Sequence, residues 1–128
     1  MYKEFFGKRK KMRFYSPEEY FETLGFIAKS DGSCDIYKEE NQKQGAWAHE
    51  VRMNCYKNLN KFPAPLKRKF TKGRGKGVLH RINCNEFFED LVNTHKFTQK
   101  KKASHNISDV RATIPVEYMK DFERGLAL

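Results

Sequence analysis

The sequence lacks the features that mark several large classes of protein. Its 128 residues include only three cysteines, Cys34, Cys55 and Cys84, an odd number at wide spacing. This argues against a disulfide framework and favours a reducing compartment, so we expect a cytoplasmic protein. No apolar run approaches the roughly 18 residues of a membrane span, and no hydrophobic segment follows the first residues. We therefore expect neither a transmembrane helix nor a signal peptide, and no membrane partner.

Short motifs for metal or nucleotide binding are also missing. The chain contains no CxxC or HxxxH pair, the spacings that usually mark a zinc site. A metal site would instead need two paired strands to bring four separate residues together, namely His49, Cys55, His80 and Cys84. The glycines of residues 73–77 lack the spacing of a phosphate-binding P-loop and the Ser or Thr that follows its lysine. We expect no metal and no other cofactor.

Acidic residues are scarce beside basic ones. The net charge is +10, from 26 Lys and Arg against 16 Asp and Glu. This balance suits a polyanionic partner, with nucleic acid first and an anionic membrane surface second. Residues 57–76, here called the basic loop, contain eight Lys and Arg and no acid. Such a segment repels itself unless an anion lies against it, so we expect it to contact nucleic acid.

The pattern of apolar and polar residues predicts one α+β domain, residues 16–128, preceded by a flexible basic arm, residues 1–15. Ser16 and Glu19 predict the capped start of a short helix over 17–24, which Gly25 weakens. Strict alternation predicts strands over 45–56 and 77–84, whose antiparallel pairing would project the basic loop. Weaker signals predict strands at 34–37 and 109–114, and helices at 86–96, capped by Asn85, and at 116–124 after Pro115. Together these give a small antiparallel sheet of three or four strands, with two or three helices packed on one face.

The basic arm and the basic loop are the predicted sites of phosphate contact. Lysine and arginine in numbers bind the sugar-phosphate backbone, and nearby glycines let it approach closely. Arg52 and Arg81 would extend the patch if their face of the sheet is open. The remaining predicted contacts are Lys8, Arg9, Lys10, Lys11, Arg13, Lys67, Arg68, Lys69, Lys72, Arg74 and Lys76.

A small nuclease or ribonuclease toxin is the alternative class. Asp35 followed by Glu50-Val51-Arg52 resembles the Asp…Glu-x-Lys pattern of metal-dependent nucleases, but arginine replaces the lysine and stays protonated. A metal-free ribonuclease would use histidine beside arginine, as in His80 with Arg81 or His49 with Arg52. Such pairs arise easily by chance on strands, so we favour a binding protein over an enzyme.

Three local patterns follow one another along the chain. They are Phe6-Gly7-Lys8-Arg9 in the basic arm, residues 49–54 on a strand, and residues 77–83 before a helix around 87–92. Their order resembles that of small basic phage proteins that inhibit type II CRISPR nucleases. The resemblance implies a phage or mobile-element origin and a partner made of a nuclease with its guide RNA. An inhibitor or component of a nucleoprotein complex is therefore a third class, and no functional residue is transferred from the family.

Overall fold

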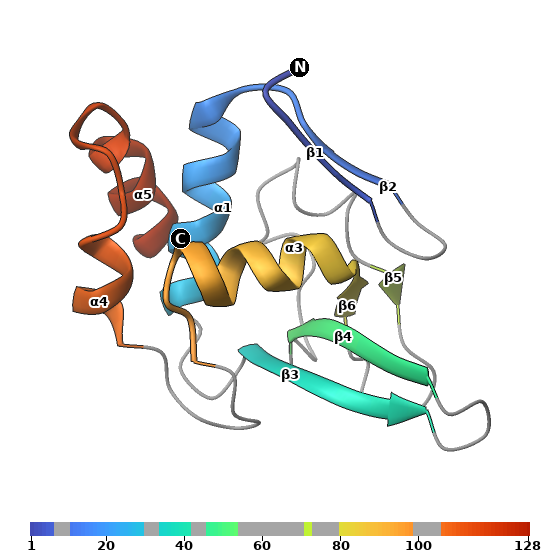
Figure 1. Cartoon of the computed structure of the whole chain (residues 1–128). Coiled ribbons are helices and arrows are strands. Elements are labelled where there is room, and N and C mark those ends of the chain that lie inside the picture. Colours follow the sequence, from blue (N-terminus) through green and yellow to red (C-terminus); the bar gives the residue numbers. More distant parts are fainter. Residues whose placement is uncertain (7–10, 30–33, 42–45, 54–70, 73–79, 99–105) are drawn as a thin grey trace.

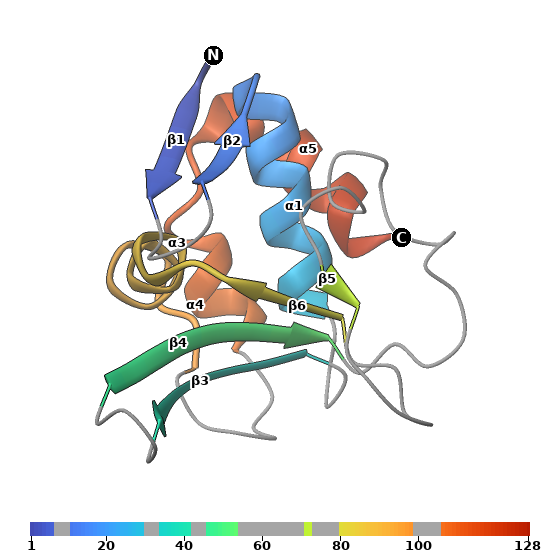
Figure 2. The same cartoon turned by 90° about the vertical axis from the view of Figure 1, so that its right-hand side faces the viewer.

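The computed structural model describes residues 1–6, 11–29, 34–41, 46–53, 71–72, 80–98 and 106–128 (Figure 1). Antiparallel strand pairing and several helices make it a small α+β fold, the class that the sequence predicts. Helix α3 lies between a two-stranded hairpin and a larger sheet, and the helices lie on the same side of that sheet (Figure 2). Within the described residues, no helix has the length and apolar character needed to span a bilayer.

The N-terminal segment forms a hairpin. Strand β1 (Lys3–Phe6) pairs antiparallel with β2 (Lys11–Phe14). Three alternate side chains, Phe5, Met12 and Phe14, are buried in the core. The prediction of a flexible arm over residues 1–15 is therefore wrong for the described part, since only 7–10 lie outside it. The period-two spacing of those apolar residues indicates strands. The prediction of a flexible arm rested instead on the basic charges.

Helix α1 (Pro17–Lys29) begins where the sequence predicts. The Ser16 hydroxyl accepts a hydrogen bond from the Glu19 N–H at 3.1 Å, the expected N-cap. The Glu19 carboxylate reaches back to the Tyr15 N–H at 3.3 Å, one residue before the cap. The predicted end near residue 24 is wrong, because the helix continues through Gly25 to Lys29.

Gly25 stays helical because it is the contact point between α1 and α5 (Met119–Leu126). A Cβ at Gly25 would lie 2.1 Å from the Phe122 carbonyl oxygen, and one at Gly125 would lie 2.0 Å from the Glu22 carbonyl oxygen. Real Cβ atoms essentially never come that close. The two glycines therefore let the helix backbones touch, and that packing outweighs the low helix propensity of glycine.

A second sheet has the order β3-β4-β6-β5 and antiparallel pairing throughout. Its strands are β3 (Cys34–Asn41), β4 (Ala46–Met53), β5 (Thr71–Lys72) and β6 (His80–Asn83). Strand β3 continues to Asn41, past the predicted end at residue 37. Strand β5 falls inside the basic loop, and the rest of that loop lies outside the described residues.

Helix α3 (Asn85–Glu89) runs directly into a π-helical turn, η2 (Asp90–Thr94). Cys84, in extended conformation, occupies the N-cap without a side-chain hydrogen bond, so the predicted capping role of Asn85 is wrong. Phe87 and Leu91 are fully buried, as their spacing predicts.

The predicted strand at 109–114 is wrong, because α4 (Ile107–Arg111) occupies that place. The Asn106 side chain accepts from the Asp109 N–H at 3.2 Å and caps this helix. A 3-10 turn, η3 (Val116–Tyr118), follows and leads into α5, close to the predicted last helix. The Asn106 cap is a polar contact between close neighbours in the sequence, so the alternation of apolar residues does not reveal it.

Candidate functional site

The outward side of the hairpin carries two cations and two exposed rings. In β2, Met12 and Phe14 are buried while Lys11 and Arg13 are exposed. Alternation continues to Tyr15, which is 63% exposed, and Phe6 at the end of β1 is 58% exposed. We define this hairpin surface as Glu4, Phe6, Lys11, Arg13 and Tyr15.

The charges of the hairpin surface are only partly paired. Glu4 forms an ion pair with Lys11, and its second oxygen lies 3.9 Å from Arg13 Nε. Lys11 Nζ also lies 5.0 Å from the centroid of the Phe6 ring. The Glu4 side chain is only 16% exposed, whereas those of Lys11 and Arg13 are 40% and 49% exposed, so two cations share one carboxylate and remain open to an incoming phosphate.

Backbone hydrogen bonds fix both ends of the hairpin surface to the helices. The Phe6 N–H donates to Glu86 Oε2 of α3 at 2.6 Å. The Tyr15 N–H donates to Glu19 Oε2 of α1 at 3.3 Å. The surface is therefore preformed, because its two rings extend from anchored backbone.

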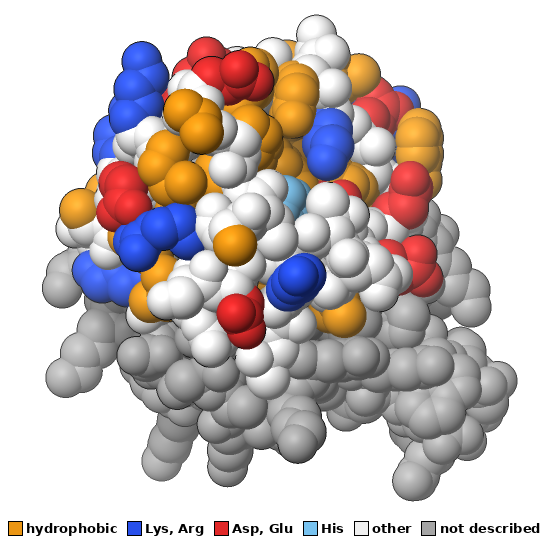
Figure 3. Space-filling view, turned by 60° about the vertical axis from the view of Figure 1, so that its left-hand side comes forward, with side chains coloured by type: hydrophobic (Ala, Val, Ile, Leu, Met, Phe, Trp, Pro, Cys, Tyr) orange, Lys and Arg blue, Asp and Glu red, His pale blue; other side chains and the backbone are white. Residues whose placement is uncertain are grey.

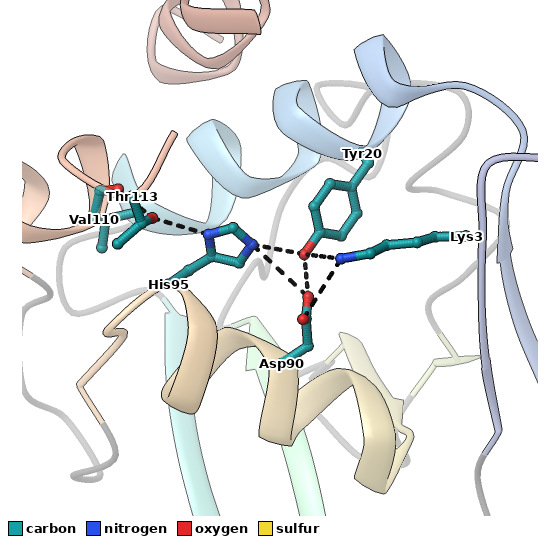
Figure 4. A network of polar contacts seen from close by, with 6 residues as sticks. All are labelled: Lys3, Tyr20, Asp90, His95, Val110 and Thr113. Carbon is teal, nitrogen blue, oxygen red and sulfur yellow. Dashed lines mark hydrogen bonds and ion pairs between the residues drawn. The ribbon is translucent and has the colours of Figure 1, made fainter. Parts of the chain in front are cut away.

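A second cluster of polar side chains lies inside the molecule (Figure 4). The Tyr20 hydroxyl donates to Asp90 and lies 2.8 Å from His95 Nε2. His95 Nδ1 lies 2.9 Å from Thr113 Oγ1. Lys3 Nζ stands at the margin, 3.4 Å from the Tyr20 hydroxyl and 3.6 Å from Asp90 Oδ1. We call these five residues the buried network.

Each member of the buried network comes from a different part of the fold. Tyr20 lies on α1, Asp90 on the π-helical turn, Thr113 after α4, and Lys3 on β1. His95 directly follows the π-helical turn, and the next residue, Lys96, adopts φ 57°, a left-handed conformation that ends the helical run. The network therefore joins the hairpin to three helical segments.

Burial sets the protonation of this network. The pKa of His95 is lowered to about 4: desolvation by burial is the main cause, the Asp90 charge acts in the opposite direction, and the charge of Lys3 adds a smaller lowering effect. The imidazole is therefore neutral at pH 7. Burial, reinforced by the Asp90 charge, raises the pKa of Tyr20, so its phenol keeps its proton.

The hydrogen bonds distinguish between the two neutral tautomers of His95. With the proton on Nε2, Thr113 donates to His95, His95 donates to Tyr20, and Tyr20 donates to Asp90. With the proton on Nδ1, Tyr20 has one proton for two acceptors, His95 Nε2 and Asp90. We infer the Nε2–H tautomer, because buried acceptors left unpaired are costly. The Thr113 hydroxyl also lies 2.6 Å from the Val110 carbonyl oxygen, a bond that this tautomer gives up. The carbonyl stays paired, because it also accepts the Thr113 N–H at 3.0 Å.

The buried network offers no room for chemistry on a substrate. Tyr20 is fully buried and His95 is 3% exposed. A neutral imidazole hydrogen-bonded through both ring nitrogens has no free position to act as a general base. We conclude that the network joins elements of the fold together, and that the hairpin surface is the better candidate for an external partner.

The structure places the predicted site residues unevenly. Lys11 and Arg13 come together on the hairpin surface. Arg52 lies directly opposite Arg81 in the β4–β6 register, and Lys72 lies opposite His80 in the β5–β6 register. The other predicted contacts, Lys8, Arg9, Lys10, Lys67, Arg68, Lys69, Arg74 and Lys76, lie outside the described residues.

Neither the two carboxylates nor the two histidines of the enzyme alternatives lie directly opposite each other in the backbone register. Asp35 lies opposite Arg52, whereas Glu50 lies opposite Tyr37 and Asn83. His49 lies opposite Lys38, whereas His80 lies opposite Met53 and Lys72. Cys84 is buried and Cys55 lies outside the described residues.

His95 and Tyr15 were not among the site residues predicted from the sequence. Nothing in the local pattern distinguishes His95, since its partners lie 18 and 75 residues away. The position of Tyr15 was available from strand alternation, which places it on the same side as Lys11 and Arg13.

Charge is divided sharply along the chain. Residues 8–13 carry five Lys and Arg and the basic loop carries eight, with no acid in either segment, so these two segments hold thirteen of the 26 basic residues. The face in Figure 3 shows both signs interspersed rather than one basic patch.

Comparisons with known proteins add no relative. No protein-family model matches the chain, and neither the curated proteins nor the solved structures include a match. Among the described residues, no group of three His, Cys, Asp or Glu side chains is arranged to hold a metal ion. Function is therefore argued from the chemistry of the side chains themselves.

Proposed function

We propose that this protein binds nucleic acid through its phosphate backbone, using the hairpin surface together with the basic loop and residues 7–10. The observation that carries the proposal is the division of charge. Residues 8–13 and 57–76 together hold thirteen of the 26 Lys and Arg and no acid, in a chain whose net charge is +10. Positive charge concentrated in a few segments gives the strong local field that a polyanion needs.

The hairpin supports the proposal by its position in the chain. Lys11 and Arg13 directly follow Lys8, Arg9 and Lys10, and the hairpin strands that flank residues 7–10 are paired and packed on the core. Lys11 and Arg13 are thus held on a paired strand. Cations held in this way lose less conformational entropy on binding than those of a free tail.

The larger sheet carries the other two predicted arginine contacts. Arg52 and Arg81 lie directly opposite each other on neighbouring strands, and Asp35 lies opposite Arg52 on the other neighbouring strand. The extension of the contact surface to these two arginines stays a prediction.

The test is a salt-dependent binding measurement. Fluorescence anisotropy with labelled DNA and RNA, single-stranded and duplex, gives the affinity at several salt concentrations. We expect affinity to fall steeply with salt and to be similar for unrelated sequences. Replacing the six predicted basic-loop contacts (Lys67, Arg68, Lys69, Lys72, Arg74 and Lys76) with serine should weaken binding to every probe.

The hairpin surface has its own variant and control. Changing Lys11 and Arg13 to serine should reduce the slope of log affinity against log salt by up to about 2, since each phosphate contact contributes roughly 0.9 on duplex DNA. Lys120→Ser, at an exposed position on α5, is the matched control and should change nothing. Unaltered binding by the loop variant and the hairpin variant together, or no binding in dilute buffer, would refute the proposal.

The same samples separate the other classes. Denaturing gels with and without Mg²⁺ reveal cleavage if the protein is a nuclease, and His80→Ala or Glu50→Ala would then identify the mechanism. Affinity purification from the native source, followed by nuclease treatment, reveals a nucleoprotein partner. A protein partner that survives the treatment would favour the inhibitor class.

A further inference from the structure

We propose that the hairpin surface binds single-stranded nucleic acid by stacking unpaired bases on Phe6 and Tyr15. This inference rests on the proposed function and narrows its substrate class. It is carried by the exposure of two aromatic rings beside two cations on one anchored face.

The exposure of these rings is selective. In the same two strands, Phe5, Met12 and Phe14 are at most 6% exposed, while Phe6 is 58% exposed and Tyr15, next after β2, is 63% exposed. Phe6 and Tyr15 therefore contribute little to the packing of the core. Single exposed apolar residues are common on protein surfaces, but here two rings flank two cations within one hairpin.

The register orders the four side chains along the surface. Phe6 lies opposite Lys11, and Arg13 and Tyr15 follow at two-residue steps on the same side. Tyr15 therefore lies about 13 Å along the strand from the Phe6–Lys11 pair. Along the surface the order is ring, cation, cation, ring. This order fits a single strand of nucleic acid whose bases stack on the two rings while its phosphates lie beside the two cations.

Stacking on a protein ring requires an unpaired base. In a duplex both faces of every internal base are covered by neighbouring bases, so exposed rings gain nothing from it without unstacking. Lys11 Nζ lies over the Phe6 ring, 5.0 Å from its centroid, so a base must take the other face of the ring or displace the ammonium, and in either case its own phosphate comes within reach of that cation. The backbone bonds of Phe6 and Tyr15 to the two helices hold the rings in place.

The experiment compares Phe6→Ala and Tyr15→Ala with the unchanged protein. Probes are labelled oligo-dT, oligo-rU and a duplex of the same length, each measured at several salt concentrations. We expect each alanine to weaken binding to the single strands by between about 5-fold and 100-fold, without changing the salt slope. Duplex affinity should change less than about 2-fold, because no base stacks there.

Two controls separate stacking from general damage. Tyr15→Phe keeps the ring and should bind like the unchanged protein. Val116→Ala removes an exposed side chain elsewhere, 91% exposed, and should also have no effect. Thermal unfolding of each variant confirms that the fold is intact.

The results distinguish this inference from the proposed function. If both alanine variants bind single strands normally while the basic-loop variant loses affinity, stacking is refuted and backbone binding stands. A preference for duplex in the unchanged protein also overturns stacking. If the rings instead serve self-association, Phe6→Ala will alter the mass in solution without altering single-strand affinity, and the inference is wrong. Absence of binding to every probe refutes both proposals.

Discussion

The stability of the fold should depend on pH through His95. In the folded state the imidazole is buried among Tyr20, Asp90, Lys3 and Thr113, and burial lowers its pKa to about 4. In the unfolded chain its pKa returns to roughly 6.5. Between these values the unfolded state binds more protons, so stability falls as the pH falls through this range.

The size of the effect follows from the two pKa values. Linkage between pKa values of about 4 and about 6.5 gives a loss of about 2 kcal/mol between pH 7 and pH 5, approaching about 3 kcal/mol near pH 4. Small proteins have only about 5–15 kcal/mol of stability, so the loss is large enough to measure. Carboxylates elsewhere contribute their own pH dependence. The contribution of His95 is therefore obtained as the difference between the unchanged protein and a variant that lacks this imidazole.

The assay is urea unfolding at pH 7 and pH 5 for the unchanged protein and for His95→Gln. Glutamine can donate and accept hydrogen bonds but does not titrate. Between pH 7 and pH 5, the free energy of unfolding of the variant should fall by about 2 kcal/mol less than that of the unchanged protein. NMR titration of the unchanged protein gives an independent measure, because the His95 imidazole should stay neutral well below pH 6. Equal pH dependence in both proteins, or a His95 pKa near its ordinary value, would refute this reasoning.

Two further predictions concern packing and the network, and both are checked by chemical denaturation. Gly25→Ala and Gly125→Ala each place a Cβ about 2 Å from a facing backbone carbonyl and should destabilise the fold by about 3 kcal/mol or more. Ser108→Ala on the exposed side of α4 should be nearly neutral, and similar stability for all three would contradict the close helix contact. Tyr20→Phe leaves Asp90 without its donor and the His95 Nε2–H without its acceptor, and should cost about 1–3 kcal/mol. Tyr15→Phe should stay within about 0.5 kcal/mol, and an equal loss in both would contradict the network.

Local signals predicted the parts of the fold that depend on neighbours in sequence. The α1 start followed from Ser16 and Glu19, which bond within the same turn. The burial of Phe87 and Leu91 followed from their i,i+4 spacing. Both predictions succeeded because the interacting groups lie within one or two helical turns.

Two predictions failed for different reasons. One depended on a distant contact, and the other on a short apolar pattern that fits two structures. Gly25 was expected to end α1, but its contact with α5 lies almost a hundred residues away. The strand expected at 109–114 rested on alternation in a short segment, which the Asn106 cap and the burial of Val110 turn into a helix. Short apolar patterns are ambiguous in this way because either structure can bury one face.

The amino-acid sequence by itself determined the charge of this protein and the places where that charge gathers, because formal charge needs no fold. It also determined the local elements whose caps and apolar spacings are self-contained. Tertiary structure decided the rest: the backbone contact of α1 with α5, the buried network of His95, and the exposed face that sets Phe6 and Tyr15 beside Lys11 and Arg13. The helix contact and the buried network depend on groups that are far apart in the sequence. The exposed face follows local strand alternation, but only the pairing of β1 with β2 brings Phe6 to it.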